Sequence, residues 1–532
     1  MHTIRLLFQL LLCLLGLGSA AVPAKTLVFC SEGNPEFLSP SLNTNTTSFD
    51  VTGQIFESLV SFKPGTTELM PALATHWTVS ADGLVYTFFL RRGVRWQYND
   101  WFSPTREFNA DDVLFSFERQ WKPQHPFYRV TRALHPYFND MGMAEMLQSI
   151  QKVDEHTVQF TLKQPVAPFV ANLAMYWAGI QSAEYAQAMY KMGMPQRIDQ
   201  APLGTGPFRW VDYEKDVAVK FKAFDDYWGG RAKVDDLVFV IHPSANVRWA
   251  KLQSGACHVM AYPSPADLQQ MRDDPRMKVL NQTGLNISYL AYNLSKKPFD
   301  DVRVRQALNM AINKRKILRT VYQQTAVPAI NPIPPIQWGY NRELDDDEFD
   351  PDGARQLLMQ AGYPQGFTTE LWAMSVQRPY LPDALKVAEL IQADLAAVGV
   401  KVVIQSPDWT GYGQGLHAGA HQMALYGWTG DNGDPDNFLN TLLGCDATHG
   451  HNVAKFCDLS YDRLVKRAKA SSDRQERTRL YEQAQAILKV QAPWLNIAHS
   501  VQFKVMRREV TGFQLSPLGR NTFYGVDIAP PN

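Results

Sequence analysis

Two short segments of the chain combine residue types that can bind charged groups. The run Gly427–Phe438 places an indole and three carboxylates in a glycine-rich turn after the strand-like Met423–Tyr426. The run Trp372–Tyr380 places Arg378 between a predicted strand and a predicted helix. A carboxylate accepts hydrogen bonds from an ammonium, and a guanidinium donates two parallel bonds to a carboxylate. Together these groups suit a zwitterionic ligand, although spacing alone fits two surface turns at least as well.

The motifs of several enzyme classes are absent from the sequence. It contains no G-x-S-x-G, no H-E-x-x-H, no G-x-G-x-x-G and no Walker A loop. His417 and His421 stand four residues apart, but without a third ligand this spacing favours a surface helix or loop. Gly204–Phe208 is glycine-rich and indicates a tight turn where two lobes meet. We therefore predict no metal, no cofactor and no enzyme activity.

A secreted hydrolase is the rival from another functional class. It would pair Asp431 with Asp434 or Asp436 as acid and base. Pro435 and two glycines predict an irregular turn here, and three acids in one turn give no preferred pair. The pattern therefore favours binding over hydrolysis.

The N-terminus has the pattern of a secretory signal peptide. Arg5 precedes the apolar run Leu6–Leu17, and the small residues Gly18–Ala21 follow, so cleavage is expected after Ala20, Ala21 or Ala24. This run is shorter than the roughly 20 residues that a helix needs to cross a bilayer. We predict that residues 1–24 form a cleaved signal and that the mature chain is soluble in the periplasm. The 52 basic and 52 acidic side chains balance, which argues against a nucleic-acid partner.

Four cysteines remain when Cys13 is lost with the predicted signal. An even number in an oxidising compartment predicts two disulfides. Three connectivities are possible; the short spacing of Cys445 and Cys457 favours that pair and leaves Cys30 with Cys257. A zinc site is disfavoured because no C-x-x-C spacing occurs.

The elements that must position these residues alternate between strands and helices. The 532-residue chain is too long for one hydrophobic core, so two or three lobes are expected. Apolar periodicity with Pro before and Gly after predicts helices at 351–361 and 383–398. Apolar runs predict strands at 237–241 and 400–404, and 86–94 with 157–162 indicate an antiparallel, β-rich insertion. The expected class is α/β.

Several segments resemble the periplasmic dipeptide-binding proteins of bacterial ABC importers, within the larger peptide and nickel solute-binding family 5. These segments occur in the order of that family's pattern and extend over nearly the whole mature chain. The matching segments are Cys30–Gly33, Tyr86–Trp96, Asn109–Val113 with Ser116, Gly204–Phe208, Val304–Ala307, Ala311–Lys314, Gln377–Tyr380 and Trp428–Phe438, together with the four mature cysteines. The resemblance implies a bilobal flytrap fold of periplasmic binding proteins, with an additional β-rich domain of about 60–200. Lobe one is then 25–284 plus 503–532, and lobe two is 285–502.

The resemblance also implies a ligand set. Asp431 would take the α-ammonium of a dipeptide and Arg378 its α-carboxylate. Around them we expect Tyr380, Trp428, Thr429, Gly430, Ser31, Glu32, Gly33 and Thr46. Strand-like backbone near Gly33 and Trp428 would pair with the peptide backbone. Thr46 departs from the family pattern, which has glycine there, and this alters the contact expected from that loop.

The partners implied are a dipeptide or short peptide, the inner-membrane permease of an ABC transporter and, as a further option, a chemoreceptor. We expect a monomer. Relatives that carry tripeptides, haem or nickel leave another ligand open, although no histidine or cysteine can be placed in the cleft as a haem or nickel ligand.

Overall fold

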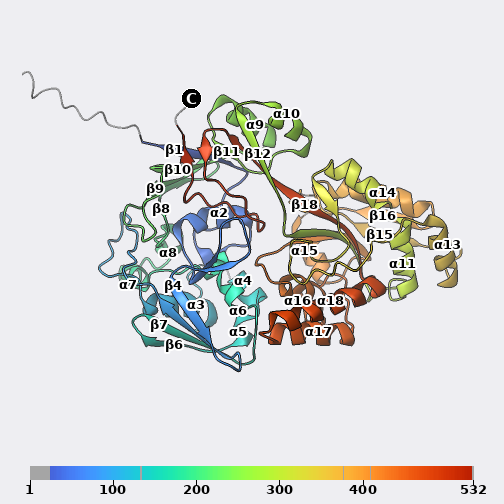
Figure 1. The fold of residues 1–532 in the computed structure, drawn as a ribbon, viewed down its shortest axis with the longest axis horizontal. Helices are drawn as coiled ribbons and strands as arrows, with labels where there is room; N and C mark the ends of the chain where they lie inside the picture. The colour runs from blue at the N-terminus through green and yellow to red at the C-terminus, as the bar shows by residue number, and fades with distance from the viewer. Residues whose placement is uncertain (1–23, 132–134, 376, 408, 530–532) are drawn as a thin grey trace, which may run out of the picture.

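The computed structural model describes residues 24–131, 135–375, 377–407 and 409–529, so the predicted signal peptide lies outside the described residues apart from its last residue. Figure 1 shows two bodies side by side: most of the N-terminal half in blue and green, and most of the C-terminal half in yellow and orange. Strands of both bodies belong to one hydrogen-bonded path, in the order β16-β15-β17-β13-β18-β11-β1-β10-β9-β8.

The first body is built around β1 (Thr26–Ser31), which pairs in parallel with β10 (Asp236–Ile241) and with β11 (Val259–Met260). Alternate side chains of β10 are buried, as the predicted strand at 237–241 requires. The sheet continues through β9 and β8, and helices cover its faces. Its other elements are β8 (Phe208–Glu214), β9 (Ala218–Ala223), β12 (Met277–Thr283), α2 (Thr46–Ile55), α9 (Ala245–Ser254) and α10 (Leu268–Asp273).

A β-rich domain is inserted in this body. Its antiparallel sheet has the order β4-β5-β7-β6. Every second side chain of β5 (Val85–Leu90) and β7 (Thr157–Leu162) is buried, so one face of the sheet forms a core. β5 ends at Leu90, so the prediction of a strand to residue 94 was wrong: a glycine with positive φ, Gly93, turns the chain there. The other elements are β2 (Val60–Phe62), β3 (Leu69–Pro71), β4 (Ala74–Val79), β6 (Leu147–Asp154), α3 (Ala110–Trp121), α4 (Pro136–Asp140), α5 (Met143–Met146), α6 (Phe169–Leu173), α7 (Ala183–Lys191) and α8 (Arg197–Gln200).

The second body is an α/β unit in which β17 (Met423–Thr429) pairs antiparallel with β13 (Asn286–Tyr292) and parallel with β15 (Thr368–Trp372). The predicted helices at 351–361 and 383–398 are confirmed as α13 and α14, and the strand at 400–404 as β16. The remaining bounds are α11 (Val302–Ala311), α12 (Lys314–Ile317), β14 (Ala326–Pro328), α13 (Pro351–Gln360), α14 (Ala384–Ala396), β16 (Lys401–Gln405), α15 (Trp409–His417), α16 (Asp436–Leu443), α17 (Leu459–Ala470) and α18 (Arg474–Gln491).

One long strand, β18 (Trp494–Arg507), belongs to both bodies (Figure 1). Its first half pairs with β13 and β14, and its second half pairs with β12 from Val501 to Arg507. β12 and β13 are separated only by Gly284 and Leu285, so both chain crossings run side by side. A Cβ on Gly284 would lie 2.9 Å from the carbonyl oxygen of Ser500, which is why the crossing requires glycine. After β18 the chain returns to the first body through β19 (Val510–Thr511) and β20 (Asp527–Ile528).

Candidate functional site

A cavity of about 840 Å³ is lined by residues of both bodies. This volume is within the usual range of small-molecule sites, roughly 300–1,000 Å³. Eight of the ten predicted ligand residues line it: Glu32, Thr46, Arg378, Tyr380, Trp428, Thr429, Gly430 and Asp431. Ser31 and Gly33 flank Glu32 but do not line the cavity. The Ser31 carbonyl instead accepts a hydrogen bond of 2.8 Å from the backbone N–H of His242.

Asp431 provides the carboxylate at one end of the cavity. Its Oδ1 accepts a hydrogen bond of 3.0 Å from the hydroxyl of Tyr137, and its Oδ2 one of 3.3 Å from Asn437. Arg520 donates to the backbone oxygen of Asp431 at 3.1 Å. Burial raises the pKa of the Asp431 carboxyl to about 6. The hydrogen bonds from Tyr137 and Asn437 and the charge of Arg520 lower this pKa, but their effect is smaller than that of burial. A carboxylate held in this way gains from a cationic partner.

The glycine-rich turn around Asp431 is shorter than the sequence indicates. The strand β17 continues to Thr429, so Trp428 and Thr429 lie on its end, and α16 already begins at Asp436. Gly430 allows the tight exit from the strand: its N–H donates to the Leu285 oxygen at 2.7 Å, and a Cβ would lie 2.7 Å from the Leu285 side chain. The Trp428 indole donates to Asn437 at 3.0 Å, which fixes the ring at the wall.

The other two acids of this turn are turned away from the cavity. Asp434 is 6% exposed and forms an ion pair of 2.7 Å with Arg477. Asp436 is 7% exposed, and its N–H donates to Asp434 at 3.0 Å. Neither lines the cavity. Asp431 therefore has no second carboxylate of its turn beside it, which removes the geometric basis for the hydrolase pair.

Arg378 lines the same cavity from a loop of the second body. It lies six residues beyond the end of β15 rather than directly at the strand end, and its backbone forms a bridge with Leu381. Tyr380 packs on β17, where a Cβ on Gly427 would lie 2.3 Å from its ring. The Tyr322 hydroxyl donates to the Tyr380 backbone oxygen at 3.0 Å. This loop is thereby fixed against β17, the strand that leads into the turn with Asp431.

Glu32 and Thr46 form the facing wall in the first body. The Thr47 hydroxyl donates to the Glu32 carboxylate. Thr46 is the first residue of α2, whose N-terminus is capped by Asn45 accepting a hydrogen bond of 2.9 Å from the Ser48 N–H. The side chain that replaces the glycine of the family pattern therefore stands directly at the cavity.

Sequence reasoning missed several residues of the site, above all Tyr137, Arg520 and Arg248, which all line the cavity. The Arg520 guanidinium lies 4.2 Å from the ring centroid of Tyr176. Arg248 donates to four backbone oxygens, among them that of Tyr262 at 3.1 Å, and thereby fixes two loops of the first body. Burial lowers the pKa of the Arg248 guanidinium. No motif contains these residues, so no sequence signal pointed to them.

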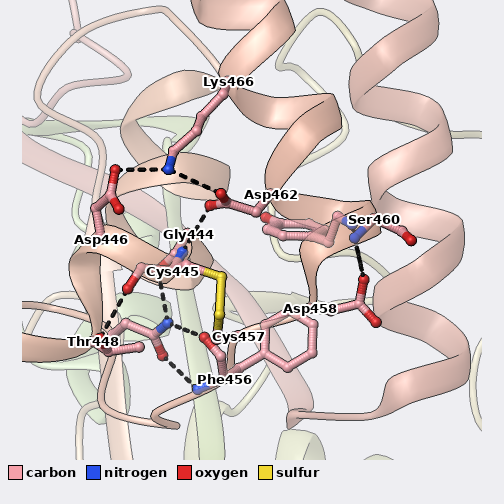
Figure 2. The surroundings of a disulfide bond; sticks show 12 residues. Gly444, Cys445, Asp446, Thr448, Phe456, Cys457, Asp458, Ser460, Asp462 and Lys466 are labelled. Carbon is pink, nitrogen blue, oxygen red and sulfur yellow. Dashed lines mark hydrogen bonds and ion pairs between the residues drawn. A yellow bond between two sulfur atoms is a disulfide. The ribbon is translucent and has the colours of Figure 1, made fainter.

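Both expected disulfides are present: Cys30 bonds Cys257, and Cys445 bonds Cys457. The first closes the end of β1, immediately before Glu32. Figure 2 shows the second, where the Cys445 N–H donates to Asp462 at 2.9 Å. The first disulfide therefore fixes one rim of the cavity covalently.

The two histidines at 417 and 421 do not share one environment. His417 ends α15, whereas His421 is fully buried and its Nε2 lies 2.9 Å from the oxygen of Val453. The surface prediction was therefore wrong for His421, whose ring is buried with one nitrogen beside a backbone oxygen. Among the described residues there is no group of three metal-binding side chains, and no helix is long and apolar enough to cross a membrane.

The whole chain, and not only its cavity, is similar to known solute-binding proteins. Residues 68–450 match the family described as bacterial extracellular solute-binding proteins, family 5 Middle. The chain is 50% identical over 512 residues to the dipeptide-binding protein of Escherichia coli (strain K12), covering 96% of each. It is 45% identical over 504 residues to heme-binding protein A of Haemophilus influenzae, covering 94% of this chain and 92% of that one. The structure of a dipeptide binding protein from Pseudoalteromonas sp. SM9913, in complex with Met-Leu, has a TM-score of 0.85 and 37% identity, covering 95% of this chain and 100% of that one.

Two α/β bodies with a cavity lined from both sides define the periplasmic-binding-protein fold, and the expected fold class is confirmed. Within that class, the chain belongs to family 5 of the bacterial extracellular solute-binding proteins.

Proposed function

We propose that this protein captures dipeptides or short peptides in the periplasm and delivers them to the permease of an ATP-driven importer, after a signal peptide of residues 1–24 has been removed. The single observation that carries the proposal is the cavity lined by both Asp431 and Arg378. A peptide zwitterion needs an acceptor at its ammonium and a fork of donors at its carboxylate. The half-identical dipeptide-binding relative supports the same ligand class.

In this proposal Asp431 accepts the α-ammonium and Arg378 binds the α-carboxylate. Each charge-assisted hydrogen bond contributes about 1.5–3 kcal/mol, whereas micromolar affinity requires about 8 kcal/mol. The remainder comes from burial against Tyr380 and Trp428 and from hydrogen bonds to the peptide backbone. Thr429 and Gly430, at the end of β17, supply the adjacent backbone.

Capture requires the lobes to close, because Asp431 and Arg378 lie on one side of the cavity and Glu32 lies on the other. We take the lobes as 25–284 with 503–532, including the β-rich insertion, and 285–502. Contacts between them support this: Tyr137 donates to Asp431, and Asn432 donates to Asn172 at 2.8 Å. Opening would break both, so ligand and interlobe bonds favour the same closed state.

Other functions fit the cavity less well. The separation of Asp434 and Asp436 from the cavity disfavours hydrolysis, so we propose a binding protein and not an enzyme. The similarity to heme-binding protein A keeps haem as a second candidate ligand, but the described lining contains no histidine or cysteine. Delivery to a chemoreceptor would use the same closed form, and the protein would act as a monomer in either role.

The decisive experiment is to denature the purified protein and identify the released ligand by mass spectrometry. Calorimetry then measures the affinity of the ligand-stripped protein for synthetic peptides. Di-alanine should bind to it, and the N-acetyl and C-terminal amide forms of di-alanine should bind more weakly. Arg378→Ala should weaken the free acid far more than the amide, by about 2–5 kcal/mol, because the buried carboxylate loses its partner. Release of haem alone, or equal weakening of acid and amide, would contradict the proposal.

A further inference from the structure

A second, smaller cavity of about 110 Å³ adjoins the main one. Both cavities are lined by Thr46, Arg378, Thr429 and Arg520. A water molecule needs about 10–15 Å³ of such space, so the cavity holds a group of several heavy atoms. None of the described residues that line it is acidic, whereas three are cationic: Arg378, Lys504 and Arg520.

Lys504 is the unusual member of this lining. It lies on β18 and is only 6% exposed. Its Nζ lies 5.5 Å from the ring centroid of Phe29 and 5.8 Å from that of Tyr262. No hydrogen bond or ion pair of its ammonium is found among the described residues. A buried ammonium without an acceptor is costly, so this group favours an acceptor that enters the cavity.

The acids nearest to Lys504 are bound elsewhere. Burial lowers the pKa of the Lys504 ammonium, while the charges of Asp50 and Glu32 raise it. Asp50 accepts hydrogen bonds from the backbone N–H, at 2.9 Å, and the side chain of Asn521. Glu32 accepts the hydroxyl of Thr47. Neither acid lines the small cavity, and neither forms an ion pair with Lys504, so both leave the ammonium's donors available to an entering group.

The small cavity shares Arg378 with the main cavity, whereas Asp431 does not line it. In the proposed function the α-carboxylate of the ligand binds Arg378. A peptide bound by its ammonium at Asp431 therefore presents its C-terminal part to this space. Two groups of a short peptide can place a negative charge there. One is an acidic side chain on the second residue, and the other is the carboxylate of a third residue.

We propose that the small cavity is a carboxylate-binding subsite in which the Lys504 ammonium donates to an anionic group at the C-terminal end of the peptide. The inference rests on the proposed peptide-binding function and specifies its preferred ligand class: short peptides that place an acidic side chain or the carboxylate of a third residue in this space. Thr46 stands where the two cavities meet, so its side chain limits which groups pass from one to the other.

The test compares matched ligands on the ligand-stripped protein by calorimetry. Ala-Glu and Ala-Gln have the same shape but differ in one charge, and tri-alanine is compared with its C-terminal amide. We expect Ala-Glu to bind about ten-fold more tightly than Ala-Gln if the side chain is the source. If the carboxylate of the third residue is the source, tri-alanine should show an advantage over its amide that Lys504→Met removes.

The variants then assign the preference to Lys504. Lys504→Met should abolish the preference and leave Ala-Gln within about three-fold of wild type, while Lys504→Arg should retain it. Lys278→Met, at a lysine of the adjoining strand β12 that lines neither cavity, is the matched control. Lys504→Gln takes the place of Lys504→Met if that variant fails to fold, because the wild-type ligand pairs alone do not distinguish Lys504 from Arg378 or Arg520.

Two results would overturn the inference. The first is a wild-type protein that binds both members of each pair equally. The second is a preference that survives Lys504→Met, which would assign it to Arg378 or Arg520. Binding of Ala-Gln without any charge preference would leave the proposed peptide-binding function standing, whereas no binding of any of these peptides would overturn both.

Discussion

Acidification should weaken dipeptide binding, because Asp431 must be ionised to accept the ligand's ammonium. Burial raises the pKa of this carboxyl to about 6 in the protein without ligand. Below that pH the carboxyl is protonated and must release its proton before the ammonium can bind, so affinity falls as the pH falls through 6. Between pH 7 and pH 5 the ionised fraction drops from about nine-tenths to about one-tenth, which raises Kd about ten-fold, or roughly 1.4 kcal/mol.

Calorimetry of di-alanine at pH 7, 6 and 5 measures this directly. Titrations in buffers of different ionisation enthalpy also count the proton released on binding. Asp431→Asn should bind more weakly at pH 7, by about 2–5 kcal/mol, but with no dependence on pH in this range. N-acetyl di-alanine, which has no ammonium, should be equally insensitive on the wild-type protein. The reasoning fails if wild type is flat from pH 7 to 5, or if Asp431→Asn retains the slope.

Two further residues give independent predictions. A Cβ on Gly433 would lie 2.3 Å from Thr67 of the facing lobe, so Gly433→Ala should obstruct closure and speed dipeptide release without touching the cavity. Gly413→Ala is the control, because a Cβ on Gly413 meets open space. Equal dissociation rates of the two variants in stopped-flow measurements would refute this. Burial raises the pKa of Glu57 to about 7, so the folded state binds an extra proton between about pH 4.5 and 7. The free energy of unfolding should therefore fall by ~3 kcal/mol as the pH rises through that window. In urea unfolding, Glu57→Gln should flatten this dependence of the unfolding free energy on pH. If the variant keeps the wild-type dependence, another group binds the extra proton.

The sequence could predict those parts of the molecule that local patterns determine. The continuous apolar run of β10 and the capped helix α14 are local, and both form where expected. Asp431 and Arg378 were identifiable because each stands in a short motif of the family. Their common cavity is a property of chain segments that are far apart in the sequence.

The missing part of the site depends on contacts that no local pattern records. Tyr137 reaches Asp431 across 294 positions of the sequence, and Arg520 reaches it across 89. Neither residue differs in local pattern from an ordinary surface tyrosine or arginine. The burial of His421 was missed for the same reason, because its acceptor, the Val453 oxygen, comes from a separate loop. Long-range packing, rather than residue type, decides the role of such side chains.

The strand β18 has a mechanical consequence. Because one continuous strand is hydrogen-bonded into the sheets of both lobes, sliding one lobe past the other would break its ladder, whereas twisting about the strand axis strains it little. The strand therefore restricts the relative motion of the lobes mainly to a rotation about its own axis. A substitution that stiffens the crossing, such as one at Gly284, would change ligand affinity through this angle.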